Sequence, residues 1–259
     1  MKITILGCGG SGGVPLIGDV WGACDRTNPK NRRRRPSIAM QWDKATVLVD
    51  ASPDLRDQLL DAGIARIDAV LFTHTHADHT HGVDDLRSVA RNMGKGTTID
   101  AYAESAFVDQ LLARFGYLFT EGTSLDALYR PILKPHRIGG PFQACGRAIV
   151  PFRQEHGLGP STGFRVGRFA YSTDVVELPE ESFAALAGIE VWIVDCLRAG
   201  DAHPTHAHLK KTLQWIERVK PRHAVLTHMN QQADYAALAK LLPPGVEPGY
   251  DGMVLDVPD

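Results

Sequence analysis

Short apolar runs rich in β-branched residues recur along the chain, and amphipathic stretches separate some of them. The runs predict strands at residues 3–6, 38–41, 46–49, 69–73, 148–152, 163–166, 169–172, 191–194 and 224–227. Apolar residues spaced three and four apart predict helices at residues 53–62, 104–115, 179–186, 207–219 and 233–241. Several strands follow one another too closely for a helix to lie between them. The pattern therefore predicts a mixed sheet-and-helix fold.

The 259 residues contain no internal repeat and no low-complexity linker. We therefore expect a single domain over residues 1–259. Residues 116–140 and 158–162 are predicted loops. In the second loop, Ser161 and Thr162 are equally compatible with a turn and with a contact to a phosphate.

Composition narrows the functional classes only slightly. Lys and Arg number 28 against 30 Asp and Glu, a net charge of -2, so the basic excess of a dedicated nucleic-acid binder is missing. The first apolar stretch, residues 3–6, is too short for a signal peptide or a membrane span. The four cysteines have no C-x-x-C spacing and are expected to be free thiols. We expect a cytoplasmic protein with no membrane contact.

Two local patterns allow both a structural and a functional interpretation. The glycine-rich residues 7–13 match neither a dinucleotide fingerprint nor a Walker loop, so a structural turn is favoured over a phosphate cradle. Residues 30–36 contain Arg32, Arg33, Arg34 and Arg35, for which a solvated loop is favoured over a phosphate clamp.

The strongest chemical signal is an H-x-H-x-D-H pattern directly after the predicted strand 69–73. It contains His74, His76, Asp78 and His79. Three imidazoles and a carboxylate within six residues would be costly to pack together without a cation to organise them. The pattern therefore predicts a metal site with room for two ions.

Two ions need more ligands than this segment supplies. Three further polar residues end predicted strands, as the first segment does. They are His156 after strand 148–152, Asp174 after strand 169–172 and His228 after strand 224–227. These residues are candidates for completing the centre.

The ordered set of these seven residues resembles the metallo-β-lactamase-fold hydrolases. Within them, the chain is most similar to the PhnP-type (phosphoribosyl cyclic) phosphodiesterases and their ribonuclease Z relatives. The supporting segments are residues 7–15, 78–82, 195–196, 204–209 and 250–253. The resemblance implies an αββα sandwich, an α/β fold with the metal site at one edge between the two sheets.

The resemblance also implies which residues hold each ion. His74, His76 and His156 would hold one divalent ion, Asp78, His79 and His228 the other, and Asp174 would bridge them. The imidazole-rich set fits zinc or manganese, and no further cofactor is expected. PhnP-type enzymes carry an additional structural zinc on clustered cysteines, but here only Cys24 lies in that region. We therefore expect no structural zinc.

Catalytic roles are expected for Asp78 and His206. His206 follows Thr205, the predicted N-cap of the helix at 207–219, and the resemblance places a catalytic histidine at this position. The alternative is a surface histidine near the cap. His81 is expected to orient a ligand without binding metal. No role is assigned to His203.

Together these residues predict a dinuclear metal-dependent hydrolase. The favoured function is a phosphodiesterase acting on a small cyclic or nucleotide-like phosphodiester by attack of a metal-bound hydroxide. Alternatives are a ribonuclease Z-like tRNA-processing nuclease, a thioesterase or lactonase of the same fold, and a metal-containing binding protein without turnover. A small phosphodiester is the expected partner, nucleic acid is disfavoured, and a homodimer is compatible with the sequence.

Overall fold

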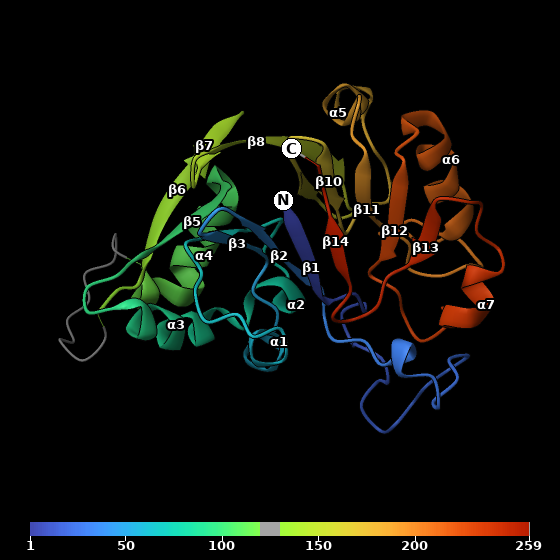
Figure 1. Ribbon diagram of the computed structural model, residues 1–259, viewed down its shortest axis with the longest axis horizontal. Helices are drawn as coiled ribbons and strands as arrows, with labels where there is room; N and C mark the ends of the chain where they lie inside the picture. The colour runs from blue at the N-terminus through green and yellow to red at the C-terminus, as the bar shows by residue number, and fades with distance from the viewer. Residues whose placement is uncertain (120–129, 259) are drawn as a thin grey trace.

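Two seven-stranded sheets pack face to face in the computed structural model, which describes residues 1–119 and 130–258 (Figure 1). Helices cover the outer face of each sheet. This is the predicted αββα sandwich of the metallo-β-lactamase type.

The first sheet contains the N-terminal half of the chain and one strand from its C-terminal end. Its order is β14 (Val254–Asp256), β1 (Lys2–Gly7), β2 (Ser37–Trp42), β3 (Ala45–Val49), β4 (Ala69–Leu71), β5 (Ile99–Glu104) and β6 (Leu133–Ile138). The helices of this half are α1 (Leu55–Asp61), α2 (Ala77–Thr80), α3 (Leu86–Met93) and α4 (Ser105–Phe115), with 3₁₀ turns η1 (Pro29–Asn31), η2 (Val83–Asp85) and η3 (Gly116–Leu118).

The second sheet is built from the C-terminal half. Its order is β13 (Val246–Pro248), β12 (His223–Thr227), β11 (Val191–Asp195), β10 (Phe169–Ser172), β9 (Pro160–Val166), β8 (Arg147–Glu155) and β7 (Phe142–Ala144). Its helices are α5 (Glu180–Leu186), α6 (Leu209–Val219) and α7 (Tyr235–Ala239).

Alternating side chains of the first sheet enter two hydrophobic cores. In β3, Val47 and Val49 belong to the core between the sheets, whereas Leu48 lies in the core beneath the helices. A strand whose two faces are both covered is apolar along its whole length, which is why residues 46–49 were recognisable as a strand. On α4, Phe107 and Leu111 complete the core on the helical side.

Parallel pairing brings strand ends from both halves to one edge of the sandwich. Strands β3 to β6 are parallel to one another, and so are β10 to β13. Residues that follow these strands therefore meet at the same edge. This topology makes the predicted strand-end residues neighbours.

The predicted strands and helices are present, but two predicted loops are wrong in part. Residues 116–140 contain η3 and β6, and residues 158–162 contain the start of β9; residues 120–129 lie outside the described residues. Strand β5 was also missed. Its polar Asp100 and Glu104 alternate with buried Ile99, Ala101 and Ala103, a pattern that lacks the apolar run of its neighbours.

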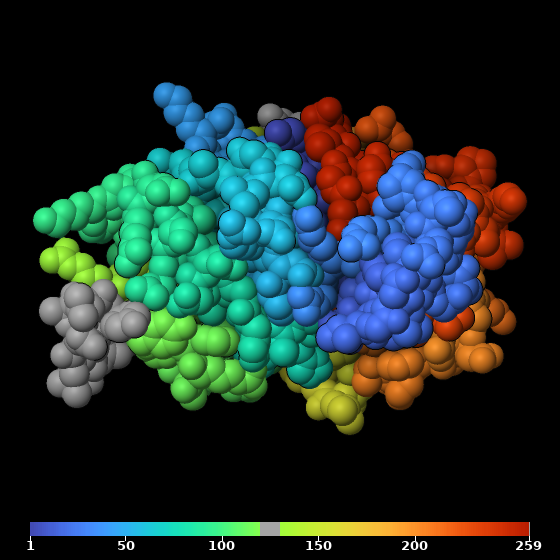
Figure 2. Space-filling model, turned by 90° about the horizontal axis from the view of Figure 1, so that it is seen from below, coloured from blue at the N-terminus to red at the C-terminus, as the bar shows by residue number. Residues whose placement is uncertain are grey.

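The N-terminal segment packs against the C-terminal elements, as Figure 2 shows in blue beside red and orange. Asn31 Nδ2 donates to Asp234 Oδ2 at 2.6 Å, and Arg33 is buried with its Nη1 3.9 Å from Cys24 Sγ. Arg34 and Arg35 pair with Asp61 and Asp54. The three carboxylate partners, Asp54, Asp61 and Asp234, are 19 to 203 positions away from the residues that they bind.

The favoured solvated loop at residues 30–36 is therefore wrong for most of this segment. Of the four arginines, Arg32 is exposed, Arg33 is buried, and Arg34 and Arg35 are partly buried. The carboxylates of α1 and its N-terminal turn hold Arg34 and Arg35 against the body of the protein. Within the described residues, no helix combines the length and apolar character needed to cross a membrane.

Candidate metal centre

All seven predicted metal ligands lie at the edge where the parallel strands end. The segment after β4 enters α2 and carries four of them; the loop after β8, the turn after β10 and the turn after β12 carry the others. The seven are His74, His76, Asp78, His79, His156, Asp174 and His228. The sandwich thus gathers side chains that are up to 154 positions apart in sequence, from 74 to 228.

The seven residues form two groups that share Asp174. The first cluster contains His74, His76, His156 and Asp174, and the second cluster contains Asp78, His79, Asp174 and His228. In each cluster, one potential ligand atom per residue lies within 4.8 Å of those of the other members. This spacing is compatible with one cation in each cluster.

The two oxygens of Asp174 face different clusters. Oδ2 lies 3.6 Å from His74 Nε2 and 3.3 Å from His156 Nε2. Oδ1 lies 3.0 Å from His79 Nε2 and 3.2 Å from His228 Nε2. A carboxylate in this position has one oxygen available to each of two adjacent cations.

Several buried polar atoms at the centre have no hydrogen-bond partner among the described residues. They are His74 Nε2, Asp78 Oδ2, His79 Nε2, and both ring nitrogens of His228. Buried polar atoms are normally satisfied, because leaving one unpaired costs about 1–3 kcal/mol. A divalent cation would satisfy these atoms together, so the residues fit the metal ions that this fold binds.

Neighbouring groups orient the ligand imidazoles. His79 Nδ1 lies 2.7 Å from Asp50 Oδ2, and Asp50 also accepts hydrogen bonds from the Thr73 amide and hydroxyl, both at 2.8 Å. His156 Nδ1 lies 2.7 Å from the carbonyl oxygen of Thr205. A ring that donates its Nδ1–H to an oxygen presents the lone pair of Nε2 to the centre.

Asp50 was not among the predicted site residues. The available signal was its position: it follows the apolar residues of β3, as Asp174 follows β10. Asp50, Asp174 and His228 also share a left-handed backbone, with φ of 61°, 54° and 59°. Such a conformation is unfavourable for residues other than glycine and is concentrated at functional sites. Sequence periodicity contains no sign of it.

Burial and charge act in opposite directions on the imidazoles. Burial, with nearby His79, holds the pKa of His74 well below its ordinary value. Burial also opposes protonation of His228, but the carboxylates of Asp174 and Asp78 raise its pKa to about 9. The second cluster therefore lies in a strongly negative environment, which favours a cation.

His206 lies beside the two clusters and is oriented by a second carboxylate. Its Nδ1 is 3.0 Å from Asp195 Oδ2, and its Nε2 is 3.9 Å from Asp174 Oδ2. Its ring stacks on that of His228, with centroids 4.5 Å apart. The side chain therefore presents Nε2 to the centre, and Asp195 is a further site residue that was recognised only as part of a family segment.

The predicted helical setting of His206 is wrong. Helix α6 begins at Leu209, with His208 and not Thr205 at the N-cap position. The Ala207 amide donates to the Val175 carbonyl, and its own carbonyl accepts from Leu197. These bonds tie Ala207 to neighbouring loops, and residues 204–206 before it form bends outside the helix.

Three other polar residues have contacts that differ from those expected. His81 contacts Thr80 and Phe115, whereas the carboxylate that orients His79 is Asp50. Ser161 and Thr162 lie in β9 rather than in a turn and are fully buried. Ser161 donates to the Asp174 carbonyl at 2.7 Å, so it supports the turn that carries the shared ligand.

Comparison with known protein families identifies the superfamily of this chain. Residues 45–229 match the β-lactamase superfamily domain. The chain belongs to the β-lactamase superfamily. The predicted resemblance to the metallo-β-lactamase-fold hydrolases is thereby confirmed. This superfamily fold commonly holds divalent metals such as zinc, in agreement with the two His/Asp clusters.

Three known proteins that are similar to this chain have different enzyme names. A crystal structure of a diphosphatase from the PhnP family is 32% identical, with a TM-score of 0.87 over 98% of this chain and 96% of that chain. The octanoyltransferase of Porphyromonas gingivalis is 32% identical over 98% of this chain, which spans only 51% of that relative. Ribonuclease Z of Pyrobaculum neutrophilum is 25% identical over 85% of this chain and 88% of its own length.

Proposed function

We propose that the chain is a dinuclear metal-dependent phosphodiesterase that acts on a small cyclic or nucleotide-like phosphodiester. The observation that carries the proposal is Asp174, whose two oxygens face two separate clusters of imidazoles and carboxylate. The similarity to a diphosphatase of the PhnP family supports phosphorus as the reaction centre.

The first cluster would hold one zinc or manganese ion, the second cluster would hold another, and Asp174 would bind both. Two such ions supply Lewis acidity, which offsets the charge of the phosphoryl oxygens and increases the acidity of water. Asp78 has one oxygen 3.5 Å from His228 Nε2 and would act as a ligand and as a proton acceptor.

His206 has the geometry of a general acid. Asp195 accepts the Nδ1–H and thereby fixes the ring, so Nε2 points to the space beside Asp174. A protonated Nε2 would donate to the departing alkoxide oxygen and stabilise its developing negative charge. Asp195 would stabilise the cationic form of the ring, as a carboxylate does for a histidine that transfers protons.

Metal content and hydrolysis of bis(p-nitrophenyl) phosphate test this proposal together. We expect about two ions per chain and turnover that chelation removes and added zinc or manganese restores. A protein with two ions but no phosphodiester turnover would favour the thioesterase, lactonase or binding alternatives.

A ribonuclease Z-like activity is the second candidate, because two proteins named ribonuclease Z are 25% and 28% identical over parts of this chain. The net charge of -2 does not favour a nucleic-acid partner. Cleavage of a precursor tRNA with a steep dependence on salt would support this candidate over a small substrate.

A further inference from the structure

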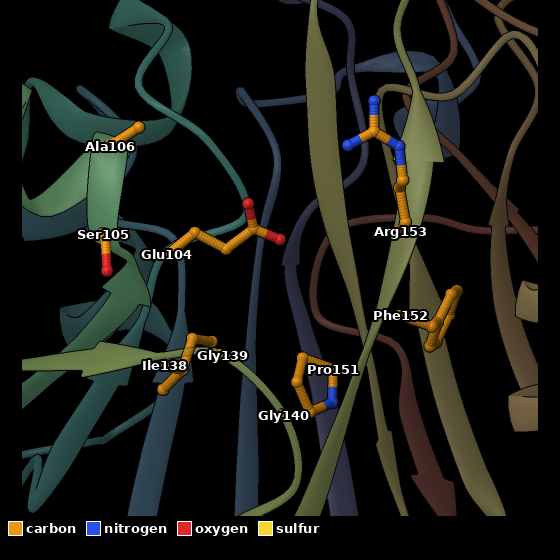
Figure 3. A pocket seen from close by; sticks show the side chains of 9 residues that line it. All are labelled: Glu104, Ser105, Ala106, Ile138, Gly139, Gly140, Pro151, Phe152 and Arg153. Carbon is orange, nitrogen blue, oxygen red and sulfur yellow. The ribbon is translucent and has the colours of Figure 1, made fainter.

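A cavity lies between the ends of β5 and β6 and the middle of β8 (Figure 3). Its volume is about 430 Å³, within the range typical of small-molecule sites. Glu104 and Arg153 lie on opposite walls, and Ile138, Pro151 and Phe152 contribute apolar surface. No residue of either metal cluster lines this cavity.

The Glu104 wall is linked to the metal centre through two intervening residues, Thr162 and Thr73. Glu104 Oε1 accepts from the Thr162 hydroxyl at 3.0 Å, and the Thr162 amide donates to the Thr73 carbonyl at 2.8 Å. Thr73 in turn places its hydroxyl 3.0 Å from His74 Nδ1. Among the described residues, the second oxygen of Glu104 has no hydrogen-bond partner and can accept one from a ligand.

The Arg153 wall belongs to β8, which ends one residue before His156. Arg153 is the cross-strand partner of Thr162, so the two side chains lie on the same face of the sheet. Its Nε donates to Glu155 Oε1 at 2.7 Å, which fixes the guanidinium. In the described part of the chain, its two terminal nitrogens make no further hydrogen bond and can donate to a ligand.

We propose that this cavity binds a nucleoside arm of the substrate, with Glu104 accepting and Arg153 donating hydrogen bonds. The inference rests on the proposed phosphodiesterase function and defines its substrate class. A carboxylate facing a guanidinium gives walls of opposite charge, which suit a neutral group with both donors and acceptors better than a second phosphate. The apolar residues suit the face of a base or sugar ring.

Comparing two chromogenic esters separates binding of the nucleoside arm from the chemical step. Thymidine 5′-(p-nitrophenyl phosphate) contains a nucleoside arm, whereas bis(p-nitrophenyl) phosphate does not. For Glu104→Ala and Arg153→Ala, we expect kcat/KM for the thymidine ester to fall about 10- to 100-fold, the effect of losing a hydrogen bond to a charged group. We expect kcat/KM for bis(p-nitrophenyl) phosphate to change less than about threefold.

A variant that fills the cavity tests the proposal independently, because it removes no hydrogen-bonding group. A Cβ built on Gly139, which lines the cavity, meets no atom within 4 Å, and the residue has no positive φ. Gly139→Trp should therefore block the nucleoside arm without backbone strain. Glu180→Ala and Arg218→Ala are matched controls, because this exposed Glu–Arg pair joins α5 and α6 and lines a different cavity.

The outcomes distinguish the two proposals. Selective loss of thymidine-ester turnover in Glu104→Ala, Arg153→Ala and Gly139→Trp, with both controls unchanged, supports the nucleoside cavity. Equal changes for the two esters in all three variants, or none, would overturn the cavity while leaving a phosphodiesterase. A wild-type protein that carries its metals and hydrolyses neither ester would overturn the proposed function and the cavity with it.

Discussion

The two candidate metal clusters share one carboxylate but differ in exposure and charge. In the second cluster, His79 and His228 are at most 1% exposed, and Asp50 lies behind His79. In the first cluster, His76 is an exposed ligand, and the three imidazoles have only the shared Asp174 as a carboxylate. The second cluster is thus fully buried and contains two carboxylates, while the first contains one exposed ligand and one carboxylate.

This difference indicates a division of labour. Two carboxylates in a buried setting attract a divalent cation more strongly than one carboxylate among neutral imidazoles. An exposed ligand leaves the first cluster accessible to an incoming substrate. We therefore expect the second cluster to retain its ion more tightly and the first cluster to be the side on which substrate exchanges.

The largest effect is expected from Asp174→Ala, because it removes the ligand that both clusters share. Bound metal should fall well below two ions per chain, and phosphodiester turnover should fall to background. Elemental analysis and the bis(p-nitrophenyl) phosphate assay measure the two effects. Asp100→Ala is a matched control, since Asp100 pairs with His136 away from the centre. Two retained ions in Asp174→Ala would contradict a shared ligand.

His206→Ala should lower kcat about 10²- to 10⁴-fold, the usual contribution of a general acid, while leaving both ions bound. His203→Ala serves as control, because that ring is 5.4 Å from His206 but has no orienting carboxylate in the described contacts. Steady-state kinetics and metal analysis on the same preparations separate catalysis from binding. Unchanged kcat in His206→Ala would remove it from the mechanism.

Asp50→Asn sharpens the comparison between the clusters, because Asp50 contacts His79 of the second cluster directly and His74 of the first only through Thr73. The amide accepts the Nδ1–H less strongly, so metal affinity should fall about 10- to 100-fold at one of the two sites. Competition with a chelator measures this affinity, and Asp54→Asn, which affects a carboxylate bound to Arg35, is the control. An equal loss at both sites would argue against separate clusters.

The smallest effect on turnover is expected at Asp251, which fixes the loop beside the second cluster. Its carboxylate accepts from the Cys8 and Arg34 amides at 3.1 and 2.7 Å, and the Cys8 carbonyl accepts from Met229, next to His228. Burial raises the pKa of Asp251 from 3.8 to about 6. The folded chain therefore holds this proton more tightly than the unfolded chain.

Because of this difference in proton binding, the free energy of unfolding depends on pH. The contribution of Asp251 to the free energy of unfolding is complete below about pH 4. It decreases by about 3 kcal/mol as the pH rises from about 4 to about 6, and it stays lost at higher pH. Asp251→Asn should remove this contribution. Urea unfolding of both proteins from pH 4 to pH 7 measures it, and parallel pH profiles for wild type and variant would contradict a raised pKa.

The fold class and the residues that meet at its edge could be predicted from the sequence, whereas some elements could not. All seven proposed ligands ended predicted strands or followed one closely, and parallel pairing brings such positions to one edge. Strand β5 was missed because its polar residues alternate with small and apolar ones. Helix α4, which follows β5 directly and has a clear apolar face, was predicted to within one residue.

Other features depend on contacts between distant segments. The burial of Arg33 follows from the fold of residues 24–36 against the loop at Asp234, which no local pattern reveals. The segment just before α6 is held by two bonds: the Ala207 amide donates to the Val175 carbonyl, and the Leu197 amide donates to the Ala207 carbonyl. The orienting role of Asp50 requires knowing that β3 and β4 are adjacent and parallel.

The central claim is a centre of two metal ions that hydrolyses phosphodiesters, and metal stoichiometry measured together with turnover tests it most directly. The protein is purified without added metal, analysed for metal content, and assayed with bis(p-nitrophenyl) phosphate before and after chelation. The account predicts about two ions per chain and turnover that is lost on chelation and restored by zinc or manganese. A protein without bound metal, or turnover that survives complete chelation, would contradict it.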